Sequence, residues 1–326
     1  MRGSSRLVAP TSLLVLLTAF FVVSSTVRAA NPPDVVRITA VANVTLRSLP
    51  SATAISVAQL PLGTEVVVVP AGLDKTWLRV KLSDGGEGWV QSSLTKSLDP
   101  VWRWPVFDGI IAERLSRTGD KFPAHAELVA FIERVMPEYT DIDGRARLEL
   151  ARLRALSLAA GAIPFKQSKR EPYATWLSSR GTDVVYDEPG SHWMVRSKTI
   201  WDARALHAAS PVADDIAWFA VINGLPGECE GHVACYLYVK NQLVGEYLRL
   251  HPSGRHASEA VELLLTSLDA FAPGGLVRAA YRFERTNECD ELTSAIGGLT
   301  AALLRTKVPS RDAVLVRLAA LRNTCG

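Results

Sequence analysis

The chain has 326 residues, of which 48% are hydrophobic, with 36 Lys and Arg against 33 Asp and Glu. Three of the basic residues, Arg2, Arg6 and Arg28, lie in the first 29 positions, so the remainder carries 33 basic residues (36 less 3) and 33 acidic ones. This neutral balance argues against a nucleic-acid-binding protein, which normally shows a basic face. The length suggests about two domains of ordinary size.

Residues 1–29 have the layout of a secretory signal peptide. Two arginines precede an apolar run at 7–23, and the small side chains of Val27 and Ala29 stand before a cleavage point that we expect after Ala29. Pro10 interrupts the apolar run, which is short for a spanning helix of ~20 residues; an uncleaved anchor is the alternative. No later segment is long and apolar enough to span. The sequence predicts a periplasmic or secreted protein with no stable membrane span after cleavage.

After a linker at 30–36, short strands are predicted at 35–41, 64–69, 77–81 and 88–91. These runs are rich in β-branched and aromatic residues and are separated by turn residues, which is typical of a small all-β barrel. Within 77–82 the alternation places Trp77, Arg79 and Lys81 on one face. The other face, with Leu78, Val80 and Leu82, is expected to be buried.

Two motifs within residues 37–98 are characteristic in their order. The first is a lead strand, an L-R-x-x-P-S loop and a G-T-x-V strand, in "ANVTLRSLPSATAISVAQLPLGTEVVVV"; the second is a closing hairpin, in "WLRVKLSDGGEGWV". They resemble a bacterial SH3 domain of the SH3b type, apart from Thr45, where that family usually has Asn. The resemblance implies a small barrel that binds a cell-wall peptide or another envelope component.

Four residues are candidates for ligand binding in this segment: Trp77, Trp89, Arg47 and Asp84. Trp and Arg side chains in a groove between the loops of a barrel supply stacking surface and hydrogen-bond donors at a low entropic cost. The alternative is structural, with Trp89 in the core after Gly88 and Arg47 bracing its loop. In that case the domain is a spacer or a packing surface.

From residue 100 the periodicity becomes helical. Apolar residues recur at steps of three and four in 107–117, 124–136 and 144–163, with prolines between these runs, and 171–179 is a fourth expected helix. Residues 181–203 differ, because β-branched and aromatic residues surround the turn sequence "DEPGS". We expect a hairpin or irregular excursion there. We expect its large rings either to line a pocket or to pack between the loop and the core; these rings are Tyr186, Trp193 and Trp201.

The last third predicts further helices at 211–224, 232–250, 255–271, 290–306 and 311–321. The expected apolar stripe on the second of these comprises Val233, Tyr236, Leu237, Leu243, Val244, Tyr247 and Leu248. The segments 232–250 and 255–271 form an expected antiparallel hairpin. Its "YLRLHPSGRHASEA" resembles one tetratricopeptide-repeat unit, without a second copy at a fixed period.

The four cysteines, Cys229, Cys235, Cys289 and Cys325, all lie in this last third. An even count in an exported chain indicates two disulfides with three possible connectivities. We expect Cys229–Cys235, with a chain bend at Gly231. We also expect Cys289–Cys325, because two antiparallel helices bring these positions within the ~7 Å that a disulfide spans.

Two chemical alternatives use the stretch around Cys229 and Cys235. Cys229 is a possible thiol nucleophile, as in wall peptidases of the NlpC/P60 type, but Glu230 occupies the position of their small Ser and no strand follows. A zinc site from Cys229, His232, Cys235 and His251 or His256 has a wider cysteine spacing than the usual two to four residues. His251, His256 and Glu259 fall around a turn, where surface histidines are the simpler interpretation.

No motif for a serine nucleophile, metalloprotease, P-loop or dinucleotide site occurs. The sequence therefore predicts a multidomain α+β protein, with an SH3-like barrel at 37–98 and a mainly helical domain at 99–326 that holds a short β-hairpin insert. We expect an exported, non-enzymatic envelope protein without cofactor or metal. Its expected partner is a cell-wall peptide or envelope protein, not nucleic acid. The alternative is a cell-wall hydrolase, a cysteine peptidase or amidase using Cys229.

Overall fold

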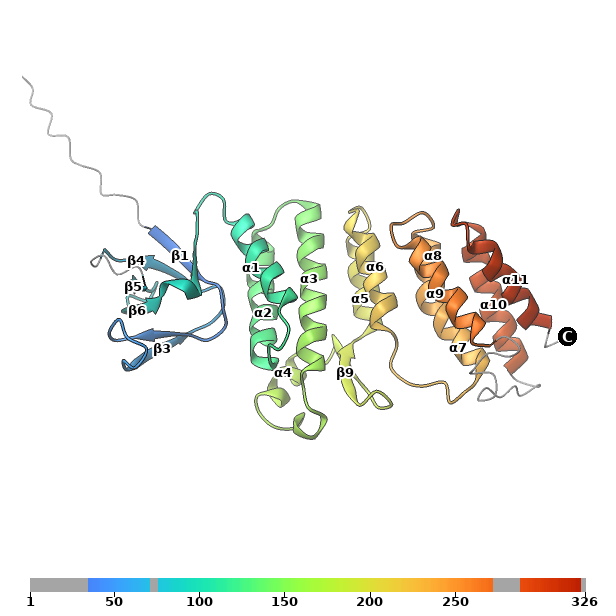
Figure 1. Ribbon diagram of the computed structural model, residues 1–326, viewed down its shortest axis with the longest axis horizontal. Coiled ribbons are helices and arrows are strands. Elements are labelled where there is room, and N and C mark those ends of the chain that lie inside the picture. Colours follow the sequence, from blue (N-terminus) through green and yellow to red (C-terminus); the bar gives the residue numbers. More distant parts are fainter. Residues whose placement is uncertain (1–34, 71–75, 272–287, 324–326) are drawn as a thin grey trace, which may run out of the picture. The chain divides into compact units, whose positions relative to one another are not determined.

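The computed structural model describes residues 35–70, 76–271 and 288–323. Strands come first and helices follow, so the chain has an α+β layout in two parts (Figure 1). None of the helices in these ranges combines the length and the apolar composition needed to cross a membrane. The expected signal peptide, most of the linker and Cys325 lie outside the described residues.

The first part is a sheet of seven strands paired in the order β3-β2-β6-β5-β4-β1-β7. The strands are β1 (Val35–Thr39), β2 (Val44–Arg47), β3 (Ser56–Leu60), β4 (Glu65–Val68), β5 (Trp77–Lys81), β6 (Glu87–Gln91) and β7 (Thr95–Ser97). All neighbours are antiparallel. Within the described ranges no pairing joins β3 to β7, so the sheet is open, and the closed barrel expected from the sequence is not shown.

Four strands, β1, β4, β5 and β6, lie where the sequence predicts them. Val80 is fully buried and Leu78 and Leu82 pack beside it, while Arg79 and Lys81 are exposed, which confirms the predicted faces of β5. The other strands, β2, β3 and β7, are not among the predicted runs. They are short or polar, and only their pairing with neighbours identifies them.

The sheet has a small core of its own. Its buried members come from five strands: Val44, Leu46, Leu60, Val66, Val80 and Val90. Gly88 allows β6 to approach β2 closely, because a Cβ there would lie 2.7 Å from Leu46 Cγ and 2.8 Å from the Arg47 carbonyl oxygen. The glycine before Trp89 is therefore a packing requirement.

A second cluster joins the sheet to the helices. Ile38, Leu62 and Leu98 belong to the same buried core as Phe107 and Phe131 from the first two helices. The described residues, 35–70, 76–271 and 288–323, accordingly belong to one compact unit. The strands therefore share one hydrophobic cluster with the helices that follow, in addition to the core of the sheet itself.

The turn between β3 and β4 is the centre of this contact. The Leu62 N–H donates to Glu127 Oε2 at 2.9 Å, and Arg134 Nη2 donates to the Leu62 carbonyl oxygen at 2.7 Å. Gly63 follows with φ +75°, and a Cβ on it would overlap the Phe131 ring. Both polar groups of one turn residue are thus held by a single helix.

The first helices are α1 (Trp104–Ser116), α2 (Phe122–Val135), α3 (Ile142–Gly161) and α4 (Tyr173–Ser179). Proline stands in the first turn of α1 and of α2, where a missing N–H costs nothing. Asp141 caps α3 by accepting the Gly144 N–H at 2.6 Å. Helix α3 contacts α1, α2 and α6, and so forms the centre of this region.

A short hairpin follows, formed by β8 (Val184–Asp187) and β9 (His192–Val195). The predicted hairpin is confirmed, but the extended excursion expected to residue 203 is wrong in its second half, because α5 (Ser197–Leu206) begins there. Ile200 and Ala203, one turn apart, are buried and favour the helix. Trp193 packs against a small buried cluster around Phe122, and Trp201 packs against the two large buried clusters that involve the helices.

The remaining helices are α6 (Val212–Asn223), α7 (Val233–Lys240), α8 (Glu246–Leu250), α9 (Ala257–Asp269), α10 (Glu288–Leu304) and α11 (Arg311–Arg322). The two predicted helical hairpins are confirmed. A π-helical segment, Asn241–Gly245, interrupts the expected helix at 232–250. Tyr236, predicted on the apolar stripe, is exposed. Gly298 of α10 lies against the π segment, where a Cβ would be 2.6 Å from Asn241 Oδ1.

Candidate functional site

Three side chains form a row across the sheet. Arg47 on β2 is directly opposite Trp89 on β6, and Trp89 is directly opposite Arg79 on β5. Residues directly opposite one another share a face of the sheet. Their neighbours in sequence, Leu46, Gly88 and Val80, are buried, so the row of Arg47, Trp89 and Arg79 (the Trp89 row) lies on the outer face.

Trp77 extends this surface. It lies two residues before Arg79 on β5 and therefore shares its face. Both Trp77 and Trp89 are half-buried, so each indole offers part of its ring to solvent. Three of the four predicted ligand-binding residues, Trp77, Trp89 and Arg47, thus lie on one surface.

Arg47 has a structural contact as well. Its Nη1 donates to the Ala54 carbonyl oxygen at 2.8 Å and so braces the loop between β2 and β3, as the structural alternative expects. Arg79 Nη2 lies 2.8 Å from Glu87 Oε2 in a solvent-exposed ion pair. Sequence reasoning did not select Arg79. The alternation with Trp77 indicates its face, but only the strand pairing places it beside Trp89.

Asp84 is separate from the row. Its Oδ1 accepts the Gly86 N–H at 2.8 Å, which closes the tight turn between β5 and β6. That turn follows the Lys81–Glu87 pair, whereas Trp77 pairs with Gln91 at the other end of the hairpin. Asp84 and Trp77 therefore lie at opposite ends of one hairpin.

The cysteine stretch forms a disulfide. Cys229 and Cys235 are bonded, with their Cα atoms 5.5 Å apart. The expected chain bend is present, since Glu230 and Gly231 both have positive φ, +45° and +86°. While this bond is intact, Cys229 has no thiol to act as a nucleophile. Cys289 is also disulfide-bonded, and its expected partner, Cys325, lies outside the described residues.

The histidines of the alternative zinc site point to three different places. His232 Nδ1 contacts the Glu288 carboxylate, and His251 Nε2 accepts from Arg204 Nε at 3.1 Å. His256 lies between Asp215 and Glu259, at 3.0 and 3.1 Å. In the described ranges no three His, Cys, Asp or Glu side chains converge as a metal site would require.

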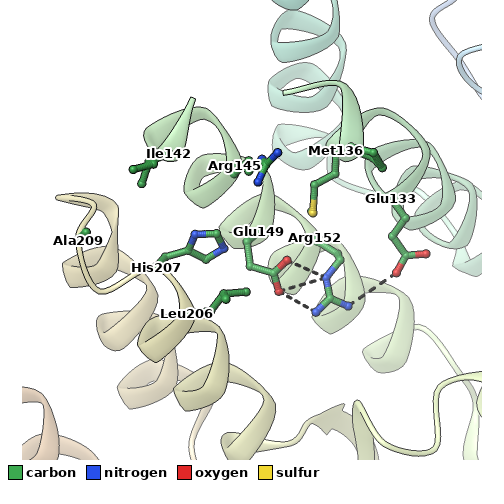
Figure 2. A pocket seen from close by; sticks show the side chains of 10 residues that line it. Glu133, Met136, Ile142, Arg145, Glu149, Arg152, Leu206, His207 and Ala209 are labelled. Atoms are coloured by element: carbon green, nitrogen blue, oxygen red, sulfur yellow. Dashed lines mark hydrogen bonds and ion pairs between the residues drawn. The ribbon is translucent and has the colours of Figure 1, made fainter. Parts of the chain in front are cut away.

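A network of buried charge lies in the helical part, around Arg152 of α3 (Figure 2). Its Nη2 lies 2.7 Å from Glu149 Oε1, and its Nη1 lies 3.4 Å from Asp183 and 3.7 Å from Glu133. Arg180 holds Glu133 through two bonds of 2.6 Å. Burial lowers the pKa of Arg152, but the hydrogen bond to Glu149 and the three negative charges outweigh burial and raise it.

Sequence reasoning missed this network. The spacing of Glu149 and Arg152, three residues apart on one helix, is visible in the sequence, but Glu133, Asp183 and Arg180 come from other segments. Comparison with known proteins found no match: no family model, no curated protein and no solved structure matches this chain. Function is therefore inferred from the geometry of the Trp89 row and of the Arg152 network.

Proposed function

We propose that this chain is an exported, non-enzymatic protein of the cell envelope that binds a cell-wall peptide or an envelope protein through an SH3b-type module. The observation that carries the proposal is the Trp89 row, with Trp77 beside it on the outer face. The motifs of residues 37–98 and the expected signal peptide support it. The helical part serves as an interaction scaffold.

The chemistry of the surface suits a peptide ligand. A half-exposed indole offers a flat apolar area with few rotatable bonds to order, and an arginine donates several hydrogen bonds in a fixed plane to a carboxylate. Trp89 lies between two arginines, so a ligand that stacks on its ring has a cation on either side. The Arg79–Glu87 pair is exposed and is worth only ~0–1 kcal/mol, so a ligand carboxylate exchanges with it readily.

The test is sedimentation of the purified protein with peptidoglycan sacculi. Wild type is compared with Trp77→Ala, Arg47→Ala and Arg79→Ala, and we expect each variant to bind about tenfold more weakly, as for a residue worth ~1.4 kcal/mol of binding energy. Matched controls are Trp102→Ala and Arg117→Ala, exposed residues outside the strands, which should bind like wild type. Thermal melts confirm that Arg47→Ala, which loses its bond to the loop, stays folded.

Two results would contradict the proposal. One is equal retention of wild type and all three sheet variants, which would mean that the row does not contact the wall. The other is release of soluble wall fragments that Cys229→Ser abolishes, which would replace the binding function with a cysteine hydrolase. An envelope protein as ligand predicts no sacculus binding by wild type but cross-linking to an envelope protein that is lost in Trp77→Ala.

A further inference from the structure

A groove follows α3 on the side that faces α5. It consists of two adjoining cavities of about 860 and 620 Å³, which share Glu149, Arg152 and Leu206 in their linings. The first cavity is enclosed by the end of α2, by α3 and by the residues after α5 (Figure 2). The second extends past Asp183 toward the start of α5. Together they are called the α3–α5 groove here.

The carboxylates of the groove are already paired. Glu149 and Asp183 contact Arg152, and Glu133 is held by both nitrogens of Arg180. The fourth carboxylate, Asp202, lies 2.6 Å from Lys198 in an exposed pair. These four carboxylates face Arg152, Arg180 and Lys198, so one negative charge remains uncompensated, fewer than the two arginines at the ends of the groove.

Cations, in contrast, are free at both ends. Arg145, in the first cavity, donates its Nε to the Tyr139 carbonyl oxygen at 2.6 Å and has no carboxylate partner in the described part of the chain. Arg196, in the second, is exposed, and its side chain makes no hydrogen bond to any described residue. His207 likewise has no side-chain partner among them. Figure 2 shows Arg145, His207 and Met136 around the same space beside the Glu149–Arg152 pair.

Apolar side chains also line the groove. Leu206, which borders both cavities, is 78% exposed, and Ile142 at the rim of the first is 61% exposed. Met136 and Pro137 continue the apolar wall. Large aliphatic side chains left exposed in a concave site mark a ligand-binding surface more often than isolated ones do.

We propose that the α3–α5 groove binds an extended peptide segment in which apolar residues are flanked by acidic ones. One acidic end meets Arg145 and His207, the other meets Arg196, and the apolar centre packs on Leu206, which borders both cavities. Two free cations at separate ends of two adjoining cavities favour a peptide over a compact monoanion. The inference rests on the proposed role of the helical part as an interaction scaffold and is independent of the Trp89 row.

The experiment is fluorescence anisotropy with the full chain and a labelled peptide of sequence DELLED. Two comparison peptides separate the contributions: DESSED lacks the apolar centre, and KRLLRK reverses the charge. We expect DELLED to bind at least about tenfold more tightly than either. Binding should weaken at ~1 M salt, where the Debye length is ~3 Å. Equal binding of DESSED or KRLLRK, or no binding of DELLED, overturns the proposal, as does complete displacement by inorganic phosphate.

Variants locate the site. Arg145→Glu and Arg196→Glu should each raise the Kd for DELLED about tenfold or more, and the milder Arg145→Gln should raise it less. Arg154→Glu is the matched control, an exposed arginine of α3 that lines a different cavity, and it should leave the Kd unchanged. A Kd that Arg196→Glu does not change refutes the two-ended site.

The same variants separate this inference from the proposed function. Arg145→Glu should retain sacculus binding, and Trp77→Ala should retain binding of DELLED. If Arg145→Glu binds DELLED normally while Trp77→Ala loses sacculus binding, the groove proposal fails and the proposed function of the sheet stands. If wild type does not bind sacculi but Arg145→Glu selectively loses binding of DELLED, the groove proposal stands and the proposed function of the sheet fails.

Discussion

Replacing Arg152 with methionine removes the only cation that contacts Glu149 in the described part of the chain. The two side chains are 15% and 10% exposed, so water compensates little for the lost partner. Methionine keeps most of the length of the side chain and leaves only a small cavity. The variant therefore isolates the effect of charge from the effect of packing.

The expected cost follows from which groups lose their partner. Removing one member of a buried ion pair costs about 3–5 kcal/mol, because the other charge stays buried. Glu133 keeps its two bonds to Arg180, and Asp183 is more exposed, so we expect about 3 kcal/mol, the lower end of that range. The double variant Arg152→Met, Glu149→Met removes both charges, and we expect it to lose only about 1 kcal/mol, about 2 kcal/mol less than Arg152→Met alone.

The measurement is urea denaturation followed by tryptophan fluorescence, with the free energy of unfolding extrapolated to water. Arg154→Met, on the same helix but exposed, is the control and should stay within about 0.5 kcal/mol of wild type. The reasoning is refuted if Arg152→Met is no less stable than Arg154→Met. It is also refuted if the double variant loses as much stability as Arg152→Met and Glu149→Met lose together.

Three further predictions concern other parts of the fold. Gly63→Ala places a Cβ against Phe131 at φ +75°, so thermal melts should show a loss of about 2–4 kcal/mol from backbone strain and overpacking; an unchanged Tm contradicts the tight contact of this turn with α2. Replacing Cys229 and Cys235 by Ser opens a loop with a sequence separation of 6 and should cost about 2 kcal/mol in the chain-entropy model. Non-reducing peptide mapping of wild type checks the bond, and a free thiol or a Cys229–Cys289 pair would show it to be wrong. Burial, and then the charge of Arg204, lowers the pKa of His251 below 6.5, so the folded state disfavours the protonated form. Stability should therefore be constant above the unfolded-state pKa and fall as the pH drops below it; His251→Gln, which keeps an acceptor for Arg204, should flatten that slope in melts at a series of pH values.

Local patterns predicted the faces of elements well. The alternation in residues 77–82 identified the buried side of β5, since period 2 depends only on the strand itself. The same local reasoning placed Trp77 on the outer face. It could not place Arg47 and Arg79 on either side of Trp89, because that neighbourhood depends on the pairing of β2 with β6, two strands far apart in the sequence.

Where tertiary contacts decide local structure, the sequence was a poorer guide. The β-branched and aromatic residues of "KTIW" suggested extended chain, but Ile200 is buried in a helix that packs on α6. The π segment at Asn241–Gly245 lies where α10 approaches closely at Gly298, a contact that no local pattern reports. The Arg152 network was missed for the same reason, since its members come from several segments of the chain.

The turn at Leu62 has a mechanical consequence. Glu127 and Arg134 bind the N–H and the carbonyl oxygen of Leu62. A force applied to the sheet therefore reaches α2 through these hydrogen bonds as well as through the connection between β7 and α1. If the outer face of the sheet binds the wall, as proposed, tension on the sheet is transmitted to the helices at the Leu62 turn. Cutting the chain after residue 98 would expose Ile38, Leu62 and Leu98, which belong to the same cluster as Phe107 and Phe131, so we expect the strands to be unstable without the helices.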